Sequence, residues 1–255
     1  MASNGLRNTQ GPEYSQAATA GVLWDMDGVI VDTGEYHYRA WSHVLAEAGL
    51  PFSQEQFRAT FGMNNIGILT MLFGRAPTAD EIAVMDVGKE QYFRELIRGD
   101  VRPLPGVRSW LASLHEAGVR QAIASSAPPE NIDFFVDELD LAEWFDARVS
   151  GTGMPGKPAP DVFLTAARAI GLPPERCVVI EDAIPGVEAA RRAGMKCIAV
   201  TTTNPAESLT AADVVVPSLA ELAPDTVWRL LNGGTFDGAS GGAFYGVFVL
   251  WLTVC

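Results

Sequence analysis

Cysteine is scarce in this sequence, with three residues among 255, at positions 177, 197 and 255. So few cysteines, so widely spaced, predict neither a disulfide framework nor a zinc site. Cys177 and Cys197 each lie at the start of an apolar run, as buried free thiols do. Free thiols fit a reducing compartment, so the expected location of the protein is the cytoplasm.

Basic residues are also scarce: 18 lysines and arginines stand against 31 acidic residues, which gives a net charge of −13. Nucleic-acid binding is therefore not expected, because phosphate backbones require clustered lysine and arginine. A small anionic substrate would bind only where local cations or a metal ion reverse the sign of the charge. The composition, 48% apolar and 19% charged, is that of a folded globular protein with a sizeable core.

Long hydrophobic runs are missing at both ends of the chain. Residues 1–20 lack the apolar core of a signal peptide, and we expect a disordered extension there. The apolar run at 243–255 has thirteen residues, whereas a membrane-spanning helix needs about 20. We therefore expect no membrane partner, and residues 232–255 are interpreted as a tail without an assigned function.

Six short apolar runs alternate with helical patterns along the rest of the chain. Continuous apolar strands separated by helices are typical of a parallel sheet covered on both faces. The pattern predicts an α/β fold with a Rossmann-like parallel sheet. The expected strands are residues 22–24, 119–124, 147–149, 177–180, 195–200 and 214–216.

One interval breaks this alternation. No strand pattern occurs between residues 33 and 101, where four helical patterns follow one another, at 35–48, 54–60, 66–72 and 79–98. We therefore expect a separate α-helical cap at residues 34–101, inserted into an α/β core made of residues 21–33 and 102–231. The segment RPLPG at 102–106 punctuates the return to the core.

Acidic pairs follow two of the predicted strands. Asp25 and Asp27 follow the first strand, and Glu181 and Asp182 follow the fourth. The carboxyl ends of parallel strands share one edge of the sheet, where ligands bind in such folds. Two acidic pairs at one edge require a hard cation, and oxygen ligands alone favour Mg²⁺. Asp32, in the same stretch DMDGVIVDT, is expected to shape the start of the next helix instead.

Three further side chains belong to this edge, and each has a second interpretation. Lys157 in GKPAPD is either a solvent-exposed lysine or a cation positioned at the site. The flanking prolines and the nearby anions favour the positioned cation. Ser125 either caps the helix that follows Pro129 or holds a phosphate oxygen. His37 either packs against its own helix or acts beside Asp27.

Two other motifs do not fit their usual ligands. A calcium loop starting at Asp25 would need Gly at position 30 and Glu at 36, where the sequence has Ile30 and Tyr36. GTGMPG at 151–156 matches a dinucleotide pattern, but the prolines in and after it keep the chain extended where a helix would have to start.

The strand-end motifs together resemble the haloacid dehalogenase-like hydrolase superfamily over about residues 20–230. DMDGVIVDT is similar to its first motif, Ser125 to its second, Lys157 in GKPAPD to its third, and Glu181-Asp182 in IEDAIPGV to its fourth. The helical insert and GEYHYRAW at 34–41 resemble the β-phosphoglucomutase branch, which also contains sugar-phosphate phosphatases.

This resemblance implies a mechanism and a set of roles. Asp25 would be the nucleophile that forms an aspartyl-phosphate, and Asp27 the acid/base. Mg²⁺ would be bound by Asp25, the Asp27 carbonyl and Asp182, with Glu181 as a ligand or as support for the ligands. Lys157 and Ser125 would hold the phosphoryl oxygens. The residues expected to help bind substrate or phosphate are Gly28, His37, Asn65 and Ser126.

The sequence departs from the mutase branch at two places. Asn65 stands where mutases carry an arginine for a second phosphate, and Pro128-Pro129 stand where they carry a lysine-asparagine pair. We therefore expect a Mg²⁺-dependent phosphatase acting on a small phosphorylated metabolite, with a sugar phosphate as the favoured substrate and a phosphohexomutase as the alternative function. A phospho-switch receiver fits less well, since receivers phosphorylate a middle strand and lack a large cap.

Overall fold

One parallel sheet organises the chain. The structure is a computed structural model that describes residues 20–60 and 63–234; the expected N-terminal extension, except Ala20, and most of the expected C-terminal tail lie outside these residues. Within them, six strands pair in the order β3-β2-β1-β4-β5-β6, all parallel. The strands are β1 (Gly21–Trp24), β2 (Arg120–Ser125), β3 (Ala147–Ser150), β4 (Cys177–Glu181), β5 (Lys196–Val200) and β6 (Val214–Val216).

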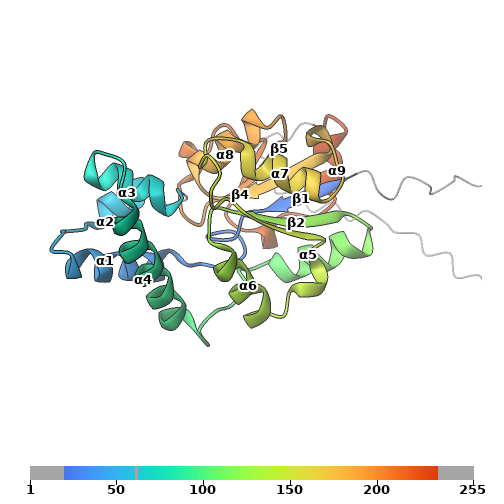
Figure 1. Cartoon of the computed structure of the whole chain (residues 1–255). Coiled ribbons are helices and arrows are strands. Elements are labelled where there is room, and N and C mark those ends of the chain that lie inside the picture. The colour runs from blue at the N-terminus through green and yellow to red at the C-terminus, as the bar shows by residue number, and fades with distance from the viewer. Residues whose placement is uncertain (1–19, 61–62, 235–255) are drawn as a thin grey trace, which may run out of the picture.

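Both faces of the sheet are buried under helices. Successive residues of each strand point to opposite sides, so neighbouring residues belong to different apolar clusters. Trp24 belongs to one apolar cluster, together with helices α5 (Val107–Glu116), α6 (Pro129–Glu138) and α9 (Thr226–Leu231). Leu23 belongs to a second cluster, with helices α7 (Asp161–Ala169) and α8 (Ile184–Arg192). The sheet is thus the middle of three layers, and the predicted Rossmann-like α/β fold is confirmed (Figure 1).

Five of the described helices lie between β1 and β2 in the chain, and the four that come before α5 gather beside the sheet (Figure 1). We call them the helical insertion: α1 (Gly34–Glu47), α2 (Gln54–Thr60), α3 (Asn65–Phe73) and α4 (Ala79–Ile97). They have an apolar cluster of their own, centred on Trp41, Leu45 and Leu69. α4 starts with a capping box, in which Thr78 and Glu81 satisfy each other's backbone N–H groups.

The two segments that join the insertion to the core lie side by side. Val31, in the segment leading to α1, forms an antiparallel bridge with Pro103, in the segment leading to α5. The backbone N–H of Leu104 donates to the carbonyl of Ile30 at 2.8 Å. The chain therefore enters and leaves the insertion through one paired connection, and α4 also packs on α6 of the core, where Phe93 meets Phe135.

Among the described residues, all six predicted strands and the predicted helices of the insertion are present, with ends within one residue of those expected. The sequence pattern did not reveal α9 or four single-turn 3₁₀ helices, whose short lengths give no periodicity. These short helices are Ala142–Trp144, Pro174–Arg176, Ala206–Ser208 and Leu219–Glu221. None of the described helices is long and apolar enough to cross a membrane.

Candidate active site

The stretch that follows β1 brings Asp25 beside the end of β4. The backbone N–H of Asp25 donates to the carbonyl of Ile180 at 3.0 Å, which continues the strand pairing by one residue. Gly28 then turns with a φ of +85°, where side chains are strained. A Cβ there would lie 1.9 Å from Asp182 Oδ2. Asp182 fills the space that a side chain at position 28 would take. Gly28 therefore serves the site by leaving that space to the Asp182 carboxylate.

Lys157 is buried and joins the two acidic pairs. Its ammonium nitrogen lies 2.6 Å from Asp25 Oδ1 and 2.6 Å from Glu181 Oε1. Burial lowers the pKa of Lys157, but the two carboxylates outweigh burial and raise it above its usual value. Of its two interpretations, the structure supports the placed cation.

In the part of the chain that the structure describes, three buried acidic residues share one cation here, Lys157, so negative charge is in excess. Burial raises the pKa of Asp25 above its usual value, against the opposing effect of Lys157. Burial likewise raises the pKa of Asp182, and the carboxylates of Glu181 and Asp25 add to the rise. The negative charge of the site is therefore only partly compensated, and a further cation would stabilise the ionised carboxylates.

Glu181 and Asp182 are held very differently. Glu181 Oε2 accepts from the backbone N–H groups of Asp182 and Ala183, both at 2.7 Å, while Oε1 accepts from Lys157. A Cβ at Gly186 would lie 1.7 Å from Glu181 Oε1, so the helix start packs directly on this carboxylate. Both oxygens of Asp182 are buried, and no group among the described residues donates a hydrogen bond of normal geometry to them, although the nearby Thr203 hydroxyl counteracts part of the rise in the Asp182 pKa.

These observations test the residues against a divalent metal ion. Asp25, Glu181 and Asp182 each offer an oxygen within 4.8 Å of the others. Unpartnered buried oxygens are costly unless something positive meets them, and hard oxygen donors suit Mg²⁺. The residues fit a divalent cation, with Asp25 and Asp182 as ligands and Glu181, whose oxygens are already used, as support.

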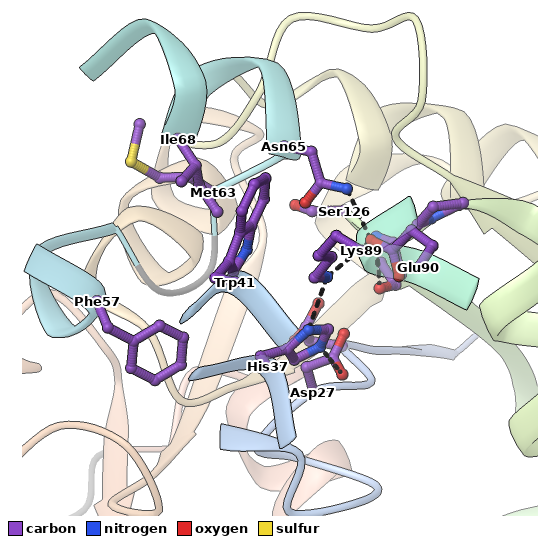
Figure 2. Close-up of a pocket in the computed structure, with 14 residues that line it drawn as sticks. Asp27, His37, Trp41, Phe57, Met63, Asn65, Ile68, Lys89, Glu90 and Ser126 are labelled. Carbon is purple, nitrogen blue, oxygen red and sulfur yellow. Dashed lines mark hydrogen bonds and ion pairs between the residues drawn. The ribbon is translucent and has the colours of Figure 1, made fainter. Parts of the chain in front are cut away.

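Asp27 points away from this acidic cluster and into a pocket. Its Oδ1 accepts from the Thr33 hydroxyl at 2.6 Å and lies 3.1 Å from His37 Nε2 (Figure 2). Burial raises the pKa of Asp27, but His37, Thr33 and the charge of Lys89 together hold it below its usual range. Any contact of Asp27 with a metal would therefore come from its backbone carbonyl.

The orientation of His37 is set from the helical insertion. Lys89 Nζ lies 2.8 Å from His37 Nδ1, and an ammonium can only donate. Nδ1 therefore accepts, which leaves the proton on Nε2, facing Asp27. The imidazole also stacks on Phe93, with ring centroids 4.0 Å apart. Of the two interpretations of His37, the structure supports the one beside Asp27.

Lys89 and Thr33 are the site residues that sequence reasoning missed. Thr33 ends the DMDGVIVDT stretch and could have been noticed there. Lys89 lies 52 residues after His37 on another helix, and no local pattern connects them. Lys89 is 1% exposed, its ammonium is paired with Glu90 at 2.7 Å, and it lies over the Trp41 ring.

The pocket lies between the strand ends and the helical insertion. Ser125, 1% exposed, ends β2, and its hydroxyl accepts from the Ala127 N–H at 3.1 Å. Asn65 starts α3 and reaches the pocket from the other side. Asn65 Nδ2 donates to Asp86 and Glu90. Both of its N–H groups are thus engaged, and neither is left to donate to a bound phosphate. The predicted site residues that line the pocket are Asp25, Asp27, His37, Asn65, Ser125 and Ser126, and Lys157, Glu181 and Asp182 lie behind Asp25.

Several proteins are similar to this chain. A model of the family "haloacid dehalogenase-like hydrolase" matches residues 19–194. The chain is 35% identical over 191 residues to Protein SUPPRESSOR OF QUENCHING 1, chloroplastic, of Arabidopsis thaliana; the match covers 71% of this chain and spans 18% of that much longer relative.

Two relatives are matched over nearly their whole length. The chain is 32% identical to Beta-phosphoglucomutase of Bacillus subtilis, covering 79% of this chain and 90% of that protein. It is 33% identical to Fructose-1-phosphate phosphatase YqaB of Escherichia coli, covering 71% and 96%.

A similar solved structure shows the same fold. It is a point mutant of CbbY from Rhodobacter sphaeroides in complex with xylulose-(1,5)bisphosphate. The TM-score is 0.73 at 27% identity, covering 80% of this chain and 96% of that one. The family match spans β1, β2 and β4, whose ends carry the acidic pairs and Ser125. The chain belongs to the haloacid dehalogenase-like hydrolase family.

Proposed function

We propose that this hydrolase is a Mg²⁺-dependent phosphatase of small phosphorylated metabolites, with sugar phosphates as the substrate class. One observation carries the proposal: the carboxylates of Asp25 and Asp27, two residues apart, face two different environments. Asp25 faces Lys157 and the acidic cluster, and Asp27 faces His37. The buried free thiols of Cys177 and Cys197 suit the cytoplasm, where we place the reaction.

Asp25 is the proposed nucleophile. Lys157 occupies its Oδ1, which leaves Oδ2 to attack phosphorus. A bond forms between this oxygen and phosphorus while the bond from phosphorus to the leaving alcohol oxygen breaks, giving an aspartyl-phosphate. Ser125 and Lys157 support this step by binding phosphoryl oxygens.

Asp27 moves the protons of both steps. Its lowered pKa keeps it ionised before substrate arrives, and the negative charge of a bound phosphate would raise that pKa. Asp27 therefore takes up a proton from solvent as the substrate binds, and then donates it to the leaving oxygen. In the second step the ionised carboxylate takes a proton from the water that attacks the aspartyl-phosphate, which releases phosphate and restores Asp25.

The acidic cluster supports the metal part of the proposal. Asp25 and Asp182 would hold Mg²⁺ with the Asp27 carbonyl, and Glu181 would keep Asp182 in place through its backbone hydrogen bond. A bound Mg²⁺ supplies charge neutralisation for the transferred phosphoryl group.

The helical insertion is the proposed cap. Its helices supply one side of the pocket, and the strand ends supply the other. We take residues 34–101 as the cap and residues 21–33 with 102–231 as the core. Closure over the substrate would exclude bulk water from Asp25 and Asp27.

The experiment is a phosphate-release screen. Wild-type protein is incubated with sugar phosphates and para-nitrophenyl phosphate, with Mg²⁺ or with a chelator. Release that depends on Mg²⁺ and disappears in Asp25→Asn is the expected result. Full activity of Asp25→Asn, or no release from any ester by the wild type, would contradict the proposal.

A phosphohexomutase is the second candidate, favoured by the 32% identity to Beta-phosphoglucomutase of Bacillus subtilis. A mutase must grip a second phosphate, but Asn65 and Pro128 line the pocket where mutases carry cations. Incubation with β-glucose 1-phosphate and a bisphosphate activator separates the two. Glucose 6-phosphate without matching free phosphate would establish the mutase and contradict the phosphatase.

A further inference from the structure

The helical insertion forms one wall of the pocket. In this wall, both side-chain N–H groups of Asn65 are engaged in hydrogen bonds with other protein groups. Asn65 Nδ2 donates to Asp86 Oδ1 at 2.5 Å and to Glu90 Oε1 at 2.7 Å. An amide nitrogen carries two hydrogens, so both are used. Figure 2 shows the nitrogen directed at Glu90. What Asn65 can still offer to a bound molecule is its oxygen, a hydrogen-bond acceptor.

The charges around Asn65 are matched or negative. Lys89 is the one lysine or arginine among the described residues that line the pocket, and Glu90 lies 2.7 Å from its ammonium. Asp86 adds a second carboxylate beside Asn65. This half of the pocket, as far as the structure describes it, therefore has no unmatched positive charge for a second anionic group.

The remaining surface of this half is apolar. Trp41 stands between Asn65 and a group made of Phe57, Met63 and Ile68 (Figure 2). Apolar side chains pack well on the C–H groups of a polyol or sugar, whereas burying an anionic group against them would be costly. The wall combines an acceptor with an apolar face.

We propose that this pocket selects monophosphate esters whose alcohol part is uncharged, with a hydroxyl that donates to Asn65 Oδ1, and that it excludes bisphosphates and phosphorylated carboxylates. The proposal rests on the proposed function and narrows its substrate class. The shared fold does not decide the matter, because CbbY of Rhodobacter sphaeroides was solved with a bisphosphate. The charge of the wall around Asn65 decides it.

Matched substrate pairs test the proposal on the wild-type protein. Phosphate release is measured for fructose 1-phosphate against fructose 1,6-bisphosphate, for glucose 1-phosphate against glucose 1,6-bisphosphate, and for phosphoglycolate. We expect kcat/KM to be about tenfold or more higher for the monophosphate of each pair, because like charges repel in a partly buried site. A bisphosphate or phosphoglycolate turned over as well as the neutral sugar monophosphates would overturn the selection.

Two charge-matched variants then locate the selectivity. Asn65→Arg places a cation between Asp86 and Glu90, and should shift the monophosphate-to-bisphosphate ratio at least about fivefold toward the bisphosphate. Ile66→Arg adds the same charge at the next residue, which is 47% exposed and outside the pocket lining, and should leave the ratio unchanged. Equal shifts in both variants, or none in Asn65→Arg, would overturn the role of Asn65.

The two proposals fail in distinguishable ways. Failure of the substrate selection leaves Mg²⁺-dependent release from para-nitrophenyl phosphate intact and reverses only the substrate ratios. Failure of the proposed function abolishes release from every ester, para-nitrophenyl phosphate included. Should Asn65→Arg not fold, the wild-type ratios still decide the substrate class.

Discussion

Two buried lysines hold the carboxylates of the candidate site, one in the core and one in the helical insertion. Lys157 of the core has two carboxylate partners, Asp25 and Glu181, each at 2.6 Å. Lys89 of the insertion has one carboxylate partner, Glu90, and one imidazole partner, His37. Both ammonium groups lie close to aromatic rings and are almost fully buried.

The difference in partners indicates a difference in role. Lys157 compensates charge: without it, the carboxylates of Asp25 and Glu181 would lie buried with no cation from the described protein beside them. Lys89 already has its own counter-charge, and its second contact fixes which His37 nitrogen carries the proton. Loss of Lys157 should therefore damage stability and catalysis together, whereas loss of Lys89 should damage catalysis more than stability.

The largest effect is expected for Lys157→Met. Removing one partner of a buried ion pair leaves uncompensated charge, which costs about 3 kcal/mol or more in unfolding free energy. Phosphate release should fall below detection as well. Urea unfolding measures the first effect and a phosphate assay the second. An unfolding free energy equal to that of the wild type would break the comparison between the two lysines.

Binding of a metal ion should compensate the negative charge that Lys157 does not neutralise, and so stabilise the folded protein. Millimolar Mg²⁺ should raise the wild-type unfolding temperature by a few degrees, because a ligand that binds only the folded protein stabilises it. Asp182→Asn should lose this response, since Asp182 is a proposed metal ligand whose buried oxygens accept no hydrogen bond of normal geometry from the described residues. Asp86→Asn, which changes a carboxylate of the insertion, serves as the control and should keep it.

An intermediate effect is expected for Lys89→Met. Loss of the His37 orientation should lower kcat, by less than the roughly 100- to 10,000-fold that a whole general acid/base contributes, because Asp27 itself remains. The unfolding free energy should fall by less than in Lys157→Met, because only one buried carboxylate, that of Glu90, loses its cation, and it keeps hydrogen bonds from Asn65 and Asn131. A loss of stability as large as that of Lys157→Met would contradict an orienting role.

The pH dependence of Lys89→Met sharpens the same point. The pKa of Asp27 is lowered from 3.8, so its stabilising contribution is present above that value and disappears as the pH falls through the folded-state pKa. Without the charge of Lys89, the folded-state pKa of Asp27 rises, and acid destabilisation should begin at higher pH. Unfolding temperatures of both proteins between about pH 2 and 5 would measure this shift.

The smallest effect is expected for Lys196→Met. Lys196 pairs with Asp213 at 2.6 Å, the same distance as in the core, but its side chain is 45% exposed. Water screens such a pair, so we expect a change of about 1 kcal/mol or less and unaltered phosphate release. A larger loss would show that distance alone, without burial, decides what a lysine contributes here.

The same comparison explains what could be predicted from the sequence. Asp25 and Asp182 each lie at the end of an apolar run, and parallel strands bring their carboxyl ends together, so local pattern and topology were enough. Asp32 also lies where it was expected, since its Oδ1 accepts from the Gly34 N–H at the start of α1.

For the helical insertion, no comparable rule predicts from the sequence which side chains meet. Lys89, Glu90 and Asn65 meet because helices pack at particular angles, and a helical pattern gives faces but not the way helices cross. Asn65 was predicted from its place in a motif, yet the sequence could not show that its nitrogen faces two carboxylates. Tertiary packing alone determined that detail.

The paired connection between Val31 and Pro103 also bears on how such proteins diversify. The insertion leaves and rejoins the core at one point, so it resembles a cassette whose two ends are already held together. Exchanging residues 34–101 with the equivalent segment of a relative should preserve the sheet and the acidic cluster while replacing the wall that meets the alcohol part of the substrate. One scaffold could in this way serve many metabolites through exchange of a single contiguous segment.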